Sequence, residues 1–215
     1  MDGNGYRILS LDELEPVPAA RQKAKLLPVR RSLGIRAFGA NGWLGDVGEL
    51  VVPPHEEDSG NEELYVVVRG RATFTLGQDQ HEAPAGTLVF VPPDTHRAAV
   101  AAEDGTIVLA VGATRGEPFE VHGWDDFTVA EALRNAGRNE EARAVMADAL
   151  ASNPAAWGLA YNTACWESLD GEHDAAFDHL RRAMEVDERE VRKWAAEDTD
   201  LDPLRDDPRW RELFG

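Results

Sequence analysis

The hydrophobic pattern of the chain changes once, shortly before residue 127. Between about residues 32 and 112, apolar runs rich in β-branched and aromatic side chains alternate with turn residues, as in "LYVVV", "RATFTL", "GTLVFVPP" and "GTIVLAV". Short strands separated by turn signals at intervals of roughly 8–12 residues are typical of all-β sandwiches and barrels. The first half of the chain is therefore predicted to form a β-barrel.

Residues 127–186 are rich in alanine and poor in β-branched side chains, which predicts helices. Gly137 and Gly171 lie 34 residues apart, and the residues around them match at the same offset. The matched pairs are Glu140 with Asp174, Ala142 with Ala176, Ala149 with Ala183, and Leu150 with Met184. A 34-residue period of helix, glycine turn and helix resembles the tetratricopeptide repeat. An ordinary helical hairpin with chance similarity is the alternative.

Two such repeats leave apolar faces uncovered, because each stacked unit buries its apolar face on a neighbour. The segment that follows predicts a capping helix and a packed tail. Its large apolar residues are Trp194, Leu204, Trp210, Leu213 and Phe214. We therefore predict an α+β multidomain chain with an N-terminal arm (1–31), a β-barrel (32–122) and a helical domain (123–215).

The net charge of the chain limits the classes of partner that it is expected to bind. With 22 basic and 40 acidic residues, the net charge is −18, which repels nucleic acid and anionic membranes. Apolar runs are shorter than the roughly 20 residues that span a bilayer, and the N-terminus does not read as a signal peptide. Cys165 is a single cysteine, so no intrachain disulfide forms. We expect a cytoplasmic bacterial protein without nucleic-acid or membrane partners.

An acidic stretch before one strand holds the candidate chemistry, "HEEDSGNEE". Residues i and i+2 of an extended chain point to the same face, so His55 and Glu57 are expected to point inward together. Glu63 opens the next strand and shares its face with Tyr65, and His96 follows a later strand. If the sheets curl into a barrel, the two histidines and two glutamates converge. Imidazole and carboxylate suit Zn, Fe, Mn, Ni or Cu.

Other interpretations of these residues stay open. The acidic run can be a solvated loop, with an empty or organic-ligand pocket in the barrel. A register slip of one residue would bring Glu62 inward in place of Glu63. Several arginines lie on or beside the predicted strands, and one pointing inward would hold a carboxylate substrate, although we expect them to face solvent. These are Arg36, Arg69, Arg71 and Arg97.

Two spacings in this region resemble the motifs of the cupin family. In "ELYVVVRG", residues 63–70, six residues separate glutamate from glycine, as in the first cupin motif, and His55 takes the place of its first histidine. In "GTLVFVP", residues 86–92, five residues separate glycine from proline, as in the second motif, and His96 falls near its final histidine. The resemblance covers roughly residues 34–112.

The chain also departs from these motifs. Glu57 stands where the second histidine normally stands, and five residues separate it from Glu63. Asp94 replaces the glycine of the second motif, and His96 arrives one residue early. The resemblance implies a small, jelly-roll-like double-stranded β-barrel that binds a metal or small molecule at its mouth. It further implies a ligand set of His55, Glu57, Glu63 and His96 for Mn, Fe, Zn or Ni.

Two functions are consistent with this reading. The first is a metal-dependent enzyme of oxygenase, isomerase or lyase type that acts on a small molecule, with Tyr65 as an acid or hydrogen-bond donor. The alternative is a non-enzymatic module that senses a small ligand or contacts a protein, with a degenerate metal site. The helical tail is expected to offer a surface to a protein partner, because repeat arrays commonly do so. The alternative is that the tail only packs on the barrel or serves as a dimerisation or stability element. We also expect a homodimer.

Overall fold

The computed structural model describes residues 6–19, 22–57, 60–119, 121 and 123–215. The chain divides into two compact units, Met1–Glu120 and Val121–Gly215. Residue 122, at which the predicted barrel domain ends, lies outside the described residues. Among the described helices, none combines the length and apolar character needed to cross a membrane.

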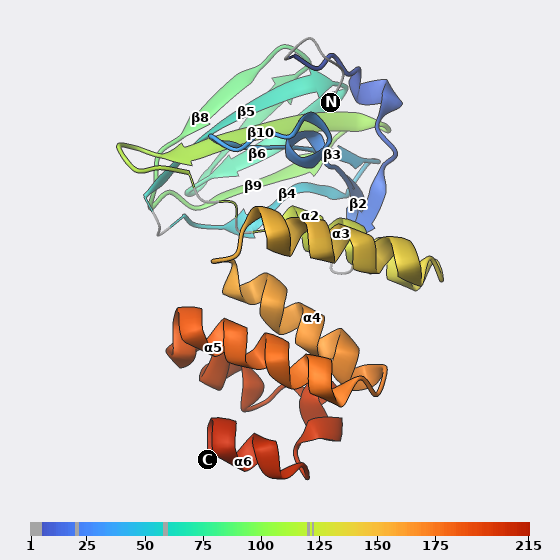
Figure 1. The fold of residues 1–215 in the computed structure, drawn as a ribbon. Coiled ribbons are helices and arrows are strands. Elements are labelled where there is room, and N and C mark those ends of the chain that lie inside the picture. The colour runs from blue at the N-terminus through green and yellow to red at the C-terminus, as the bar shows by residue number, and fades with distance from the viewer. Residues whose placement is uncertain (1–5, 20–21, 58–59, 120, 122) are drawn as a thin grey trace. The chain divides into compact units, whose positions relative to one another are not determined.

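The first unit is built from two antiparallel sheets (Figure 1). The six-stranded sheet has the order β1 (Val17–Ala19), β2 (Gln22–Leu27), β3 (Gly39–Gly45), β10 (Thr106–Thr114), β5 (Asn61–Arg69) and β8 (Leu88–Val91). The four-stranded sheet has the order β4 (Leu50–His55), β9 (Arg97–Ala101), β6 (Arg71–Leu76) and β7 (Asp79–Pro84). Several neighbours are far apart in sequence, such as β3 and β10 or β4 and β9, as in a jelly roll. This topology confirms the predicted β-domain.

The main core lies between the two sheets, because both contribute buried side chains to one cluster. Strand β5 shows the expected alternation: Tyr65 and Val67 are buried, whereas Leu64 and Val68 are exposed. Across the core, the ring of Phe74 on β6 lies 5.7 Å from the ring of Tyr65. The alternation places one face of β5 toward the interior, and that face carries the candidate site.

The N-terminal segment packs on the outer face of the six-stranded sheet. Leu14 follows η1 (Leu11–Glu13) and joins Leu27 and Ile107 in a second apolar cluster. Helix α1 (Val29–Leu33) contributes to the same cluster. Strands β1 and β2 lie in the segment predicted as an arm, and β2 pairs with β3. The N-terminal segment thus supplies strands to the six-stranded sheet and side chains to the apolar cluster on its outer face.

Gly70, in the turn between β5 and β6, has a positive φ of 72°. A β-carbon there would lie 2.5 Å from Thr106 Oγ1 and 3.0 Å from Thr106 Cα. Gly70→Ala should therefore lower the free energy of unfolding by roughly 2–4 kcal/mol, from backbone strain and a steric clash together. The measurement is urea-dependent hydrogen exchange in β5 and β6.

Gly77→Ala provides the matched control for this prediction. Gly77 has a φ of 60°, and a β-carbon there would meet nothing within 4 Å. This variant isolates the backbone strain and should cost only about 1 kcal/mol. Equal losses in the two variants would show that the contact with Thr106 adds nothing.

The second unit is helical. Its elements are α2 (Trp124–Asn135), α3 (Asn139–Ser152), α4 (Trp157–Leu169), α5 (His173–Ala195), η2 (Thr199–Leu204) and α6 (Pro208–Phe214). Helices α2 and α3, and then α4 and α5, contact each other as successive hairpins. Gly137 and Gly171 occupy the two turns with φ of 77° and 79°. The helical prediction is confirmed, and the assignment to the tetratricopeptide family stays a prediction.

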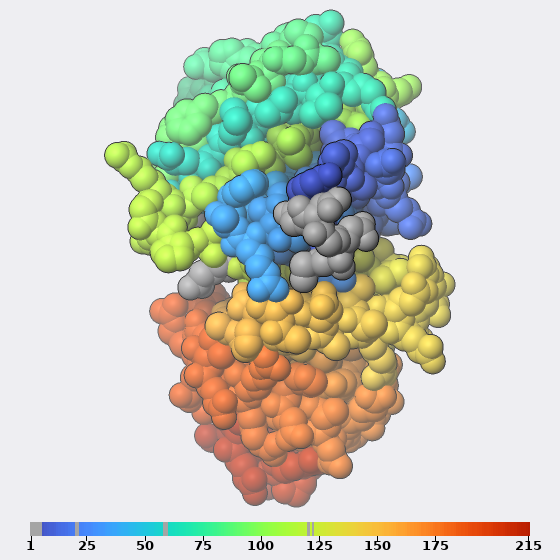
Figure 2. All heavy atoms as spheres, turned by 45° about the horizontal axis from the view of Figure 1, so that its top comes forward, coloured from blue at the N-terminus to red at the C-terminus, as the bar shows by residue number. Residues whose placement is uncertain are grey.

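Small side chains let the paired helices approach closely. Ala142 and Ala176, which match in the 34-residue period, are buried, and so are the matched Ala149 and Ala183. Figure 2 shows one face of this unit, whose atoms are coloured from yellow to red. The alanines that carried the sequence period thus belong to the core.

The end of the chain packs on this core, although Trp194, one of the residues predicted to cover it, is 42% exposed. Asp187 breaks α5 with a non-helical φ of −145° and accepts a hydrogen bond from the Glu190 amide. The residues after Asp187 therefore form a separate capping helix. Leu204 is fully buried, and Trp210 packs against the same apolar cluster.

Candidate functional site

The candidate site lies between the two sheets at one end of the β unit. His55 ends β4 and pairs with Arg97, which begins β9 in the same sheet. Glu63 and Tyr65 come from β5 in the opposite sheet, and Glu57 follows β4 by two residues. Both sheets therefore contribute side chains to one cluster.

Glu63 is the centre of this cluster. Its Oε2 accepts a hydrogen bond of 2.6 Å from the Tyr65 hydroxyl. The same oxygen lies 3.2 Å from Arg97 Nε and 3.5 Å from His55 Nε2. His55 Nε2 also lies 3.8 Å from Glu57 Oε1. Two carboxylates, an imidazole, a phenol and a guanidinium thus meet within a small volume.

The ring of His55 is oriented by the backbone. Its Nδ1 lies 2.7 Å from the carbonyl oxygen of Pro53. Because a carbonyl only accepts, Nδ1 carries a hydrogen and donates it. This fixes the ring so that Nε2 faces Glu57 and Glu63. Neutral His55 would present a lone pair there, which is the usual arrangement of a metal-binding histidine.

The pKa values of the central pair move apart. The hydrogen bond with Glu63 raises the pKa of His55 above its usual range, although burial acts in the opposite direction. Burial acts to raise the pKa of Glu63, but hydrogen bonds with His55 and Tyr65 outweigh it and hold that pKa below its usual range. Glu63 is therefore ionised at neutral pH.

Burial, together with the hydrogen bond to Glu63, raises the pKa of Tyr65 far above its usual value. Tyr65 therefore keeps its proton and donates a hydrogen bond to Glu63. The geometry makes Tyr65 a residue that positions this carboxylate. The predicted catalytic role of Tyr65 stays a prediction.

Tyr65→Phe removes the hydroxyl and keeps the ring. Because the lost hydrogen bond favours the ionised form of Glu63, the pKa of Glu63 should rise in the variant. Stability that depends on ionised Glu63 is present above the unfolded-state pKa and is lost as the pH falls through the folded-state pKa. In the variant this contribution should be smaller, and its loss should be complete at a higher pH. A titration of carboxyl carbons by NMR checks this. An unchanged pKa would contradict the hydrogen bond.

Arg97 corrects one expectation. The four arginines near the strands were expected to face solvent, but the side chain of Arg97 is fully buried. Arg97 begins β9 on the inward face, where its Nη2 donates to the Pro92 carbonyl over 3.2 Å. Its Nη1 has no hydrogen-bond partner among the described residues. The sequence did contain a signal that residue 97 points inward, because the spacing of the second motif places its final histidine at residue 97.

The structure brings three of the four predicted ligands together. Among the described residues, the ligand atoms of His55, Glu57 and Glu63 all lie within 4.8 Å of one another. His96 does not belong to this group, and the inward side chain at that end of β9 is Arg97. The role of His96 stays a prediction.

The donor set fits a hard divalent ion in its chemistry. Two carboxylate oxygens and an imidazole nitrogen favour Mn, Fe or Zn over Cu, and the backbone orients the imidazole. The guanidinium of Arg97 beside Glu63 acts against such an ion through charge repulsion. The two carboxylates oppose that repulsion, so the residues present are compatible with a metal ion.

A second group of potential ligands lies in the helical unit and comprises Cys165, Asp198 and Asp200. Cys165 is buried, and its Sγ lies 3.6 Å from Asp198 Oδ2. Burial and the nearby carboxylate raise the pKa of the thiol well above its usual value. Metals bind the thiolate, whereas the thiol of Cys165 keeps its proton. Cys165 is therefore a core residue, as predicted.

Comparison with known proteins identifies relatives of the first unit, the β unit. The cupin domain family matches residues 46–112. The uncharacterized protein SCO3923 of Streptomyces coelicolor is 34% identical over 83 residues, which cover 38% of this chain and 71% of that protein.

Solved structures are less similar. A sugar phosphate isomerase from a cupin superfamily of Silicibacter pomeroyi shares 19% identity with a TM-score of 0.43, over 50% of this chain and 75% of that one. A cupin protein from Bacteroides fragilis shares 23% identity with a TM-score of 0.36, over 51% of this chain and 91% of that one. Such similarity says nothing about the chemistry of this site. The family match, the relative and the sheet topology together show that the chain contains a cupin domain and belongs to the cupin family.

Proposed function

We propose that the cupin domain of this chain binds a divalent metal ion and acts on a small molecule as a metal-dependent enzyme. The observation that carries the proposal is the convergence of ligand atoms from His55, Glu57 and Glu63 within 4.8 Å of one another. Mn(II), Fe(II), Zn(II) and Ni(II) are the candidate ions. When bound, such an ion supplies Lewis acidity or activates oxygen, so oxygenase, isomerase and lyase reactions are the candidate classes.

The surrounding side chains prepare the site for this role. The Pro53 carbonyl holds the His55 ring so that Nε2 faces the carboxylates. Tyr65 holds Glu63 through a 2.6 Å hydrogen bond, and its raised pKa keeps it a donor. These contacts fix the orientations of two ligands before any ion arrives, which reduces the cost of ordering them on binding.

A second candidate function is a metal-free module that binds an organic ligand. Arg97 favours it, because this permanent cation stands where the family motif places its final histidine and lies 3.2 Å from Glu63. The raised pKa of His55 also favours a proton on the ring, and a proton competes with a metal ion. In this alternative the chain would recognise a small molecule without converting it.

Metal content separates the two candidates. The full chain is purified without a tag, incubated separately with Mn(II), Fe(II), Zn(II) and Ni(II), and measured by elemental analysis after gel filtration. About one ion per chain supports the enzyme and justifies activity screens. Absence of stoichiometric metal with all four ions overturns the enzyme proposal and leaves the binding module.

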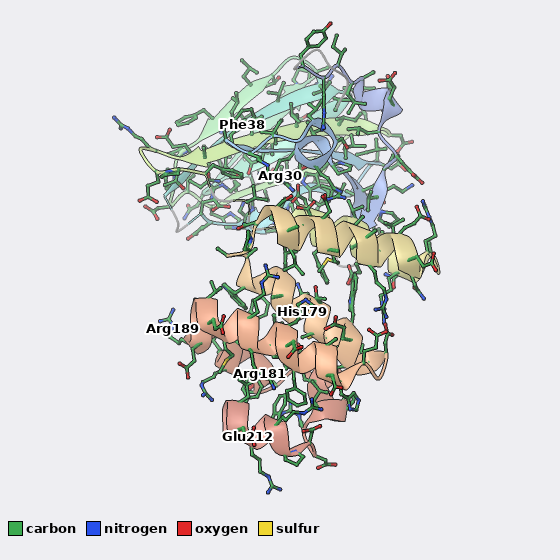
Figure 3. All side chains as sticks on the ribbon, in the orientation of Figure 1. Arg30, Phe38, His179, Arg181, Arg189 and Glu212 are labelled. Carbon is green, nitrogen blue, oxygen red and sulfur yellow. The ribbon has the colours of Figure 1, made fainter. Side chains whose placement is uncertain are left out.

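The helical unit is proposed to bind a protein partner. It contains a pocket of about 210 Å³ that includes Trp166, Leu150 and Arg134 in its lining. His179, labelled in Figure 3, also lines it and pairs with Glu167 over 2.8 Å. Such a pocket accommodates an apolar side chain of a peptide beside charged groups.

The proposed homodimer is tested separately by light scattering, and a monomeric mass would overturn it.

A further inference from the structure

The guanidinium of Arg97 is buried with too few hydrogen-bond partners. Its side chain has no exposed surface, and Nη2 donates to the Pro92 carbonyl. Nε lies 3.2 Å from Glu63 Oε2 as an ion pair, but neither Nε nor Nη1 has a hydrogen-bond partner among the described residues. A guanidinium has five N–H donors, and buried donors are nearly always paired. The described protein groups therefore do not supply all the acceptors that the guanidinium of Arg97 requires.

The exposed fractions of the side chains give the depth of this arginine. They fall from 32% for His55 and 28% for Glu57 to 12% for Glu63 and 0% for Arg97. The histidine and Glu57 therefore lie nearest to solvent, and Arg97 lies deepest. Because Arg97 is the most buried side chain of the cluster, a ligand that contacts it must be small.

Formal charge gives the sign of the ligand. A divalent ion and Arg97 would bring three positive charges, whereas Glu57 and Glu63 bring two negative charges and His55, as a metal ligand, is neutral. One positive charge is left in a partly buried site, where an uncompensated charge is costly. A ligand with a single negative charge would neutralise it.

We propose that the site takes a small carboxylate, and that Arg97 is the residue that recognises it. This inference rests on the proposed function, because the charge count includes the metal ion. A carboxylate matches the planar fork of a guanidinium and carries one negative charge. Inorganic phosphate is a mixture of monoanion and dianion at neutral pH, and its dianion would meet Glu57 and Glu63 with a charge in excess.

The test is calorimetric titration of the full, metal-loaded chain with acetate, glycolate and pyruvate, and with inorganic phosphate for comparison. At least one carboxylate should bind at least about tenfold more tightly than phosphate. Arg97→Met, which keeps most of the apolar stem of the side chain without its charge, should weaken that binding at least about tenfold. Arg71→Met is the matched control, because Arg71 is a partly exposed strand arginine paired with Glu103, and its affinity should stay within about twofold.

A second measurement does not depend on the folding of a variant. In the wild-type chain, the Nε–H signal of Arg97, assigned by its correlation with the other side-chain and backbone signals of that residue, should shift in NMR spectra as the carboxylate is added. If buried water alone satisfies Arg97, no carboxylate will bind more tightly than phosphate and the signal will not move. Either result overturns the inference, and so does unchanged affinity in Arg97→Met.

The same samples separate this inference from the proposed function. Elemental analysis reports the metal content of each preparation. Metal without carboxylate binding overturns the role of Arg97 and leaves the metal site intact. Carboxylate binding in a chain that takes up no metal overturns the metal proposal and with it the charge count. Recognition by Arg97 then stands on the loss of binding in Arg97→Met.

Discussion

His55→Ala should reduce the metal content of the chain from about one ion to less than about a tenth of an ion. His55 supplies the single imidazole among the three ligands that the structure brings together. Loss of an outer-shell partner already lowers metal affinity by roughly 10–100-fold, so loss of a direct ligand should lower it by more than about 100-fold. Elemental analysis after gel filtration, followed by calorimetric titration with the preferred ion, measures the loss.

His81→Ala is the matched control, because His81 is an exposed histidine on β7 in the same unit. Its metal content should equal that of the wild-type chain. Full occupancy in His55→Ala would remove His55 from the site and would contradict the proposed ligand set.

His96→Ala tests the ligand for which sequence and structure differ. The second cupin motif predicts a loss of metal, whereas the group found in the structure, which lacks His96, predicts full occupancy. We expect occupancy to be retained. A loss comparable to that of His55→Ala would show that His96 completes the site when metal binds.

Phe74→Ala should destabilise the β unit by about 3–5 kcal/mol. The Phe74 side chain is fully buried between the sheets, and its ring lies 5.7 Å from that of Tyr65 at an angle of 58°. Truncation removes apolar burial and leaves a cavity beside the tyrosine that positions Glu63. Urea-dependent hydrogen exchange in β5 and β6 measures the loss separately from unfolding of the helical unit.

Phe90→Ala makes the same chemical change on an exposed surface. Phe90 lies on β8 with 59% of its surface exposed, so its truncation should change stability by no more than about 0.5 kcal/mol. A loss in Phe74→Ala as small as that of Phe90→Ala would show that the space between the sheets is not the core described here.

Local pattern was sufficient for much of the fold. The alternation along "ELYVVVRG" predicted that Glu63 and Tyr65 share a face, and the hydrogen bond between them agrees. The paired glycines at 137 and 171 marked two helical turns, because both adopt a positive φ that glycine tolerates best. Such features depend on neighbours within a few residues, so they can be predicted from the sequence.

Long-range pairing decided what local pattern could not. Strand β2 alternates lysine with apolar residues, but its role in the six-stranded sheet depends on pairing with β3, more than a dozen residues later. Sequence reasoning therefore treated this segment as part of an arm. Which strands are neighbours is a property of the whole sheet and leaves a weak local signal.

The end of β9 gives the sharpest division between the two levels. The sequence determined that His55 and Glu57 lie two residues apart and that Glu63 shares a strand face with Tyr65, because strand period and motif spacing are local. Their convergence depended on two sheets that face each other. Only the tertiary structure decided that Arg97 points inward. Side chains of a strand alternate between faces, so a shift of one residue exchanges interior and exterior. The packing of β9 against β4 and β6 sets that register, and with it the charge of the site.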